Sequence, residues 1–296
     1  MRETLAKCRI IGYMDKRDGN IKPIRIPFAP KSEVLLAQDR FIMEMMKLDG
    51  NQGAYIGKLE GKNIPVQLDL KNLLTKHVAI MAKSGAGKSY CTGVLLEEIM
   101  DRNVPLLIID PHGEYSSMKY ANDDKKDIQK MKHYKIKPKR YTNNIKEYGY
   151  LEGMNPIKLN DNIKAEELIH LLPTKLSSSQ MALLYNAIKN MPKVDLANLI
   201  LELEYEESPS KYNIISVVNH VKEMNIFSVN YTPFNELIQP GRASILNLKG
   251  LPPEGQQIVV YKLMKDLFEQ RKLNKIPPFF AVVEEAHNFC PRTSFW

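Results

Sequence analysis

The feature that most constrains this chain is a short glycine-containing segment, AKSGAGKS, at residues 82–89. It follows the apolar run HVAIM at 77–81 and precedes residues 89–100, whose apolar side chains recur at helical spacing. A strand, a glycine-rich turn and a helix in this order are typical of a phosphate-binding loop with the pattern G-x-x-x-x-G-K-[ST]. Ala82 stands where that pattern has its first glycine, while residues 87–89 match its last three positions. The sequence therefore predicts a site for nucleotide phosphates.

The residue types in this loop explain the expected chemistry. Gly85 and Gly87 let the backbone curl until several N–H groups converge on phosphate oxygens, and the start of the following helix adds unpaired donors and a favourable dipole. Lys88 is expected to reach the β- and γ-phosphates of ATP, and the Ser89 hydroxyl to ligate Mg²⁺. The residues predicted to contact the nucleotide are Ser84, Gly85, Ala86, Gly87, Lys88, Ser89, Tyr90 and Asp110.

Further apolar runs indicate the fold class. Buried parallel strands are expected at residues 105–110 (PLLIID), 244–248 (SILNL) and 279–283 (FFAVV). Helical spacing of apolar residues occurs at 166–172, 180–188 and 214–221, and over the long segment 254–272. Strands that alternate with helices in this way predict an α/β domain built on a parallel sheet.

Acidic residues follow the last of these strands. Glu284 lies directly after the apolar run, at the predicted strand tip, and Glu285 is next. An ATPase of this kind needs one acid that holds the metal through water and often a second that orients the attacking water. We expect Glu284 to be the metal-side acid and Glu285 the general base, a pair that points towards a motor-type ATPase. Asp110, at the end of another strand, is expected at the same edge of the sheet, as a site residue or as a cap of the next element.

Residues 1–70 differ from the rest, because short apolar runs are separated by turn-forming segments such as DKRDGN and DGNQG. Strands are expected at 6–11, 21–26, 34–37, 55–59 and 64–68, with one helix at 39–48. We predict a small β domain, a partial barrel, at 1–70. An α/β domain follows at 71–296, with a basic and helical insertion at about 119–235.

Positive charge is concentrated in that insertion. The net charge of the chain is +8, and residues 119–146 contain ten Lys or Arg and three Asp. Such a segment either attracts a phosphate backbone or is a solvated surface insertion. Basic charge alone therefore does not establish DNA binding.

The sequence also indicates a cellular setting. No apolar run approaches the ~20 residues of a membrane span, and the first residues, MRETLAKCRIIGY, lack the apolar core of a signal peptide. Cys8, Cys91 and Cys290 are few and widely spaced, which is typical of a reducing compartment. We expect a cytoplasmic protein without a membrane partner.

Four segments together resemble the HerA family of DNA translocases, within the larger HerA/FtsK group: HVAIMAKSGAGKS (77–89), LLIIDPHGEY (106–115), GRASILNL (241–248) and VVEEAHNFCP (282–291). The N-terminal segments AKCRIIGY, EVLLAQD and AYIGKL are similar to part of that family's small β-barrel domain. The resemblance implies a RecA-like, parallel-sheet P-loop ATPase core that forms a homohexameric ring and moves duplex DNA through its channel. It also implies a NurA-type nuclease partner, with a role in DNA end resection and recombinational repair. Lys88, Ser89, Glu284 and Glu285 match the family's phosphate, Mg²⁺, metal-side and catalytic-base positions.

Two other functions stay open. The first is a related conjugative-transfer ATPase that pumps protein or single-stranded DNA, although the N-terminal segments and DPHGEY favour HerA. The second is an ATP-gated DNA-binding scaffold with little turnover. The feature that supports this alternative is that the chain ends eleven residues after Glu285, before the further strands, polar sensor and arginine finger of such a core. We therefore expect a shortened form whose arginine comes from a neighbouring subunit, Arg242 being only a weak candidate.

Overall fold

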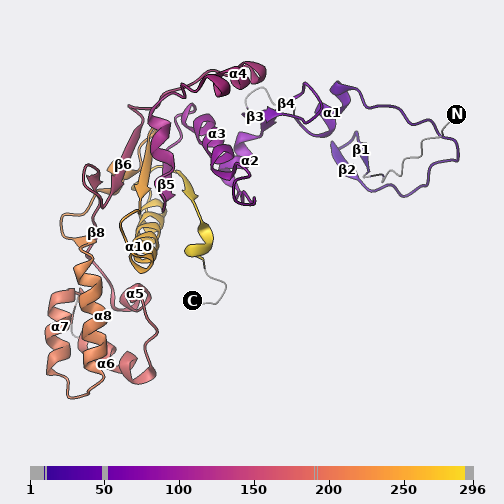
Figure 1. The fold of residues 1–296 in the computed structure, drawn as a ribbon. Helices are drawn as coiled ribbons and strands as arrows, with labels where there is room; N and C mark the ends of the chain where they lie inside the picture. Colours follow the sequence, from indigo (N-terminus) through magenta and orange to yellow (C-terminus); the bar gives the residue numbers. More distant parts are fainter. Residues whose placement is uncertain (1–9, 11, 49–52, 190, 192, 291–296) are drawn as a thin grey trace. The chain divides into compact units, whose positions relative to one another are not determined.

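The structure is a computed structural model that describes residues 10, 12–48, 53–189, 191 and 193–290. The chain divides into two compact units, residues 1–95 and 96–296 (Figure 1). The boundary falls within the helix α3 (Lys88–Met100), so the glycine-rich loop belongs to the first unit and the acidic pair to the second.

The first unit contains two separate antiparallel hairpins. One pairs β1 (Tyr13–Asp15) with β2 (Asn20–Lys22), and the other pairs β3 (Ala54–Lys58) with β4 (Pro65–Leu68). The helix α1 (Asp39–Met45) lies between them in sequence, as predicted, and α2 (Leu70–Thr75) follows the second hairpin. The Asp69 side chain accepts a hydrogen bond from the Asn72 N–H at 2.6 Å, which caps α2.

Two predicted strands of this unit are wrong. Residues 34–37 and 77–81 pair with no other described segment and form no strand. Their side chains are largely exposed, with Leu36 at 96% and Met81 at 90%, because an apolar run forms a buried strand only where a neighbouring strand covers it. The prediction for 6–11 falls almost wholly outside the described residues.

The second unit is built on a five-stranded parallel sheet with the order β11-β5-β10-β6-β7 (Figure 1). Its strands are β5 (Leu106–Asp110), β6 (Ile145–Gly149), β7 (Asn155–Pro156), β10 (Ala243–Asn247) and β11 (Phe280–Val283). Every residue of β5 and β10 is buried, as expected for strands in the middle of a parallel sheet. Three of these strands match the predictions, and the carboxyl ends of all five point to one edge.

Helices fill most of the chain between the strands. The unit contains η1 (Tyr115–Lys119), α4 (Lys125–Tyr134), α5 (Ala165–Leu171), α6 (Ser178–Ile188), α7 (Leu196–Tyr205), α8 (Lys211–Glu223), α9 (Phe234–Leu237), α10 (Pro253–Lys272) and η2 (Ala286–Asn288). A short parallel pair, β8 (Leu159–Asn160) and β9 (Phe227–Ser228), joins the start and end of the α5–α8 segment. The helices predicted at 166–172, 180–188, 214–221 and 254–272 are confirmed. Among the residues described, no helix is both long and apolar enough to cross a membrane.

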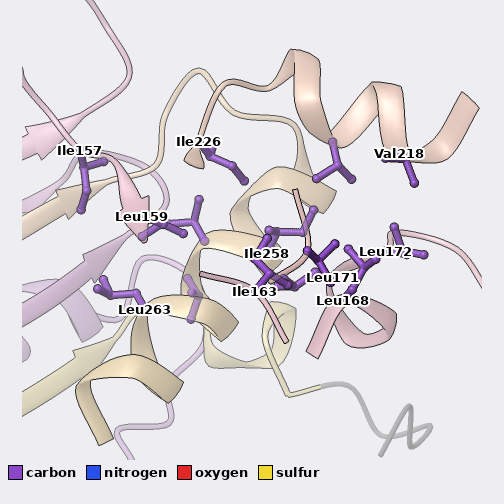
Figure 2. Packing of buried hydrophobic residues seen from close by; sticks show 14 of the residues in the cluster. Ile157, Leu159, Ile163, Leu168, Leu171, Leu172, Val218, Ile226, Ile258 and Leu263 are labelled. Atoms are coloured by element: carbon purple, nitrogen blue, oxygen red, sulfur yellow. The ribbon is translucent and has the colours of Figure 1, made fainter. Parts of the chain in front are cut away.

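One hydrophobic core connects the sheet to the helical segment. Figure 2 shows Ile163 and Leu168 facing Ile258 of α10, with Leu171 beside them. All four side chains are less than 5% exposed. The burial of such aliphatic side chains contributes about 1.5–3 kcal/mol each, so α10 holds the helical segment firmly against the sheet.

Candidate nucleotide and metal site

The glycine-rich loop has a backbone that requires glycine at two positions. Gly85 has a φ of +74° and Gly87 a φ of +90°. A side chain added at either position would meet nothing within 4 Å, so the requirement comes from the left-handed backbone and not from crowding. The N–H of Ala86 donates to the carbonyl of Lys83 at 3.1 Å, which closes the turn. This geometry leaves the loop open for a ligand.

The helix α3 starts at the last loop residues. Lys88 and Ser89 are half-buried in its first turn, and Tyr90 is 62% exposed. The Thr92 hydroxyl donates to the Lys88 carbonyl at 3.0 Å, so the turn is stabilised from within. A helix start that carries a lysine and a hydroxyl residue suits a Mg²⁺-bound polyphosphate. The nucleotide contacts of residues 84–90 stay a prediction.

Asp110 organises the turn after β5. Its Oδ1 accepts hydrogen bonds from the N–H of Gly113 (2.8 Å) and of Glu114 (3.1 Å), and its Oδ2 accepts one from the N–H of Tyr115 (3.0 Å). The side chain is 1% exposed. These are the contacts of a capping residue, the second of the two roles that the sequence left open. A direct contact between Asp110 and the nucleotide stays a prediction.

The same turn places a tyrosine against the first acid of the pair. Tyr115 is 3% exposed, and its hydroxyl donates to Oε1 of Glu284. The Glu284 N–H donates to the Ile109 carbonyl at 3.1 Å, which continues the β5–β11 pairing beyond the strand. The structure therefore brings Asp110 and Glu284 to one sheet edge, linked through Tyr115. Sequence reasoning did not assign a role to Tyr115.

Glu285 has an unusual backbone. Its φ of 48° and ψ of 44° lie in the left-handed region, which is uncommon for a residue with a side chain. Its Oε2 lies 3.3 Å from Nδ1 of His287, whose side chain is 73% exposed. The Gln257 side chain of α10 donates to the Asn288 carbonyl at 2.9 Å and ties the following turn to the core. Strained residues of this kind are found at functional sites.

A further carboxylate, Glu147, was not found from the sequence. Oε1 of Glu147, on β6, accepts hydrogen bonds from the Ser116 hydroxyl (2.5 Å) and the Asn247 amide (3.0 Å), and Lys119 lies 2.7 Å from its Oε2. Burial tends to raise the pKa of Glu147, but these three partners together lower it below its ordinary value. Asn247 is the last residue of β10 and lies within the predicted strand 244–248, which was the only sequence signal near Glu147.

The carboxylates alone do not make a metal centre. Within the described ranges, no group of three or more His, Cys, Asp or Glu side chains could hold a metal ion. Mg²⁺ in proteins is usually held by one or two protein oxygens, several waters and substrate phosphates. Ser89 and Glu284 are residues of the right type for this role.

Comparisons with known proteins identify the family to which the chain is similar. Residues 54–267 match the family described as Helicase HerA, central domain. A probable DNA double-strand break repair helicase HerA from Methanocaldococcus jannaschii is 25% identical over 97% of this chain and 65% of its own length. The DNA double-strand break repair helicase HerA of Saccharolobus solfataricus is 26% identical over 98% and 59%. The chain thus spans roughly three fifths of these relatives.

A solved structure shares the fold. VirB4 of Thermoanaerobacter pseudethanolicus superposes with a TM-score of 0.54 at 15% identity, covering 82% of this chain and 70% of that one. This likeness concerns the fold alone and supports an α/β, RecA-like P-loop architecture. The match to residues 54–267 covers well over half of the chain, and the chain therefore belongs to the HerA helicase central-domain family.

Proposed function

We propose that this chain is the ATPase part of a motor that moves duplex DNA. The observation that carries the proposal is the loop 82–89, in which Gly85 and Gly87 have positive φ and lead into a helix whose first turn contains Lys88 and Ser89. Coupling to DNA is supported by the family match and by relatives named DNA double-strand break repair helicases.

Each candidate residue has a defined part in the proposed reaction. Lys88 and the N–H groups of residues 84–90 hold the β- and γ-phosphates. Mg²⁺, when bound, neutralises charge that develops on the phosphate oxygens. Ser89 and Glu284 are its protein partners, the latter through water. Glu285 accepts a proton from the water that attacks the γ-phosphate.

We further propose that the active form is a homohexameric ring. In a ring, an arginine from the neighbouring subunit can stabilise the transition state, as arginine fingers do in related enzymes. A NurA-type nuclease would then process the DNA ends that the motor presents, in resection for recombinational repair. Both points rest on the family resemblance.

The test is ATP turnover with and without duplex DNA. Lys88→Ala should abolish turnover and weaken Mg·ATP binding, whereas Lys83→Ala, at an exposed lysine in a variable position of the same loop, should leave both unchanged. Glu285→Gln should bind ATP normally but hydrolyse it ~10²–10⁴-fold more slowly, as expected when a general base is lost. Glu284→Gln should instead change the Mg²⁺ dependence.

The outcomes separate the competing functions. Normal turnover in the Lys88→Ala variant would exclude the assigned site. Strong ATP binding with negligible turnover in every condition would favour the ATP-gated scaffold. Turnover that duplex DNA does not stimulate, but single-stranded DNA or protein does, would favour a transfer motor. The ring is tested separately by measuring sedimentation and specific activity over one dilution series, and full activity in a monomeric fraction would exclude it.

A further inference from the structure

Residues 120–141 form an excursion whose two ends are joined. The Thr142 hydroxyl donates to the Lys119 carbonyl at 2.6 Å, so the residues on either side of the excursion lie next to each other. Near the return, the Tyr141 hydroxyl donates to Oδ1 of Asp101 at 2.9 Å, and Lys139 pairs with the same carboxylate. Between these anchors lies α4, which Figure 1 draws well away from the five-stranded sheet. None of the α4 residues is buried.

Local interactions, and not packing, explain why α4 is a helix. The Asp124 side chain accepts hydrogen bonds from the N–H groups of Lys126 (2.8 Å) and Asp127 (3.1 Å) at its start. Lys135 ends it in the left-handed conformation, with a φ of 58°. A ten-residue helix without a buried face is marginal on its own. The chain thus maintains a helix whose side chains do not serve the hydrophobic core.

The two faces of α4 differ in character. At 3.6 residues per turn, Lys125, Lys126, Gln129, Lys132 and His133 fall on one half of the helix, and all five are exposed. Ile128 and Met131 fall on the other half and are half-buried. The outward half is therefore the basic one, and it is continued by Lys135, Lys137 and Arg140 in the exposed segment that follows.

The positive charges of this outward half are not neutralised by the protein itself. Residues 125–140, which we call the basic arm, contain eight Lys or Arg and one Asp. Lys130 and Lys139 pair with Asp127 and Asp101. Among the described residues, no carboxylate lies within ion-pair distance of the other six. The arm therefore presents a dense positive field to any polyanion.

The chemistry of the arm favours a nucleic-acid backbone over other polyanions. A helix that lies on a membrane needs a broad apolar face, which α4 lacks. The exposed large apolar side chains of the arm are Tyr134 (40%) and Ile136 (37%), fewer than the clustered anchors typical of a protein interface. Lys125 and Lys132 lie seven residues apart, about 10.5 Å along the helix axis. That length of duplex carries about six phosphate charges, enough for each of these exposed lysines to meet one without any reading of bases.

We propose that the basic arm is a phosphate-backbone contact surface for duplex DNA, bound without regard to sequence. It includes none of the residues assigned to the ATP site and rests on the proposed function only in taking DNA as the polyanion. The arm adds a tether on the outside of the sheet, so that DNA stays held while the nucleotide site turns over.

The test is a salt titration of equilibrium binding to a fluorescently labelled duplex of arbitrary sequence, without nucleotide. The arm variant carries Lys125→Gln, Lys126→Gln and Lys132→Gln. The control variant carries Lys222→Gln, Lys272→Gln and Lys275→Gln, which removes equal charge from exposed lysines without described ion-pair partners. The slope of log affinity against log salt should flatten by up to about 2.7 in the arm variant, at roughly 0.9 per lost phosphate contact, and remain unchanged in the control.

Each result decides the question. Equal slopes for the arm variant and the original chain would overturn the arm proposal and leave the DNA motor standing. An original chain that hydrolyses ATP but does not bind duplex DNA would overturn both. Loss of binding to phosphatidylserine vesicles, with an unchanged DNA slope, would reassign the arm to membranes. Equal flattening in the control would show a general charge effect and would also overturn the proposal.

Discussion

Replacing Tyr115 by phenylalanine removes one hydroxyl from the interior and leaves the ring in place. That hydroxyl donates to the Glu284 carboxylate, in a pair where Tyr115 is 3% and Glu284 9% exposed. Hydrogen bonds to charged groups contribute about 1.5–3 kcal/mol to stability. Because so little of the carboxylate is exposed, water can replace the lost donor only in part. We therefore expect the free energy of unfolding to decrease by about 1.5–3 kcal/mol. For a protein of this size, that decrease lowers Tm by about 3–12 °C.

The assay is urea or thermal unfolding followed by circular dichroism, with Tyr120→Phe as the matched control. Tyr120 is 69% exposed, so removal of its hydroxyl should leave the stability unchanged. A second measurement addresses the site: if Glu284 is the metal-side acid, Tyr115→Phe should raise the Mg²⁺ concentration needed for half-maximal turnover more than it lowers the maximal rate.

The two measurements refute different parts of the reasoning. Identical stability of Tyr115→Phe and Tyr120→Phe would mean that the buried hydrogen bond contributes nothing. A stability loss with an unchanged Mg²⁺ dependence would leave Tyr115 as a purely structural residue and would argue against Glu284 as the metal-side acid.

Three further predictions concern the same unit. Lys262 is 2% exposed and lies 3.1 Å from Glu167 and 2.9 Å from Asp266. Lys262→Met should cost about 3–5 kcal/mol, because it leaves the buried Glu167 with only the more distant Lys265, at 3.8 Å; denaturant unfolding should show that adding Glu167→Gln restores much of the loss. The lowered pKa of Glu147 stabilises the fold above the ordinary glutamate pKa of about 4.3, and this stability is lost as pH falls through the lower folded value. Glu147→Gln should therefore flatten the acid side of a stability–pH curve, a result that an unchanged curve would contradict. Tyr150 has a buried hydroxyl without a hydrogen-bond partner among the described residues, and Tyr150→Phe should leave the melting temperature equal or slightly higher, since replacing an unsatisfied polar group is nearly neutral or stabilising.

Much of the second unit could be predicted because local pattern and burial agree there. The runs at 105–110, 244–248 and 279–283 form strands within one or two residues of the predicted bounds. The helix predicted at 254–272 begins at Pro253, a residue that favours the first helical turn. In each case the apolar residues face a core, so the sequence pattern and the energy of burial indicate the same structure.

The strand β6 could not be predicted, although it lies between two strands of the sheet. Its sequence IKEYG buries Ile145, Tyr148 and Gly149, while Lys146 and Glu147 are only half-buried. Lys146 pairs with Glu236 at 2.6 Å, and Glu147 is held by residues from η1 and β10. These partners are distant in sequence, so the sequence alone does not show that the charged side chains are paired. The segment IKEYG therefore has the composition of a solvated loop. Tyr115 was missed for the same reason, since its partner Glu284 lies 169 residues away.

The left-handed backbone at Glu285 gives a physical reason to separate the two acids. Glu284 continues the extended backbone of β11, because its N–H still bonds to Ile109 of β5. One residue later the chain turns through a conformation that costs about 1–2 kcal/mol for a residue with a side chain. A glycine would relieve that cost but would remove the carboxylate. Glu285→Gly should therefore raise or maintain the melting temperature while abolishing turnover, and an inactive variant that is also destabilised would show that the Glu285 side chain has a structural role instead.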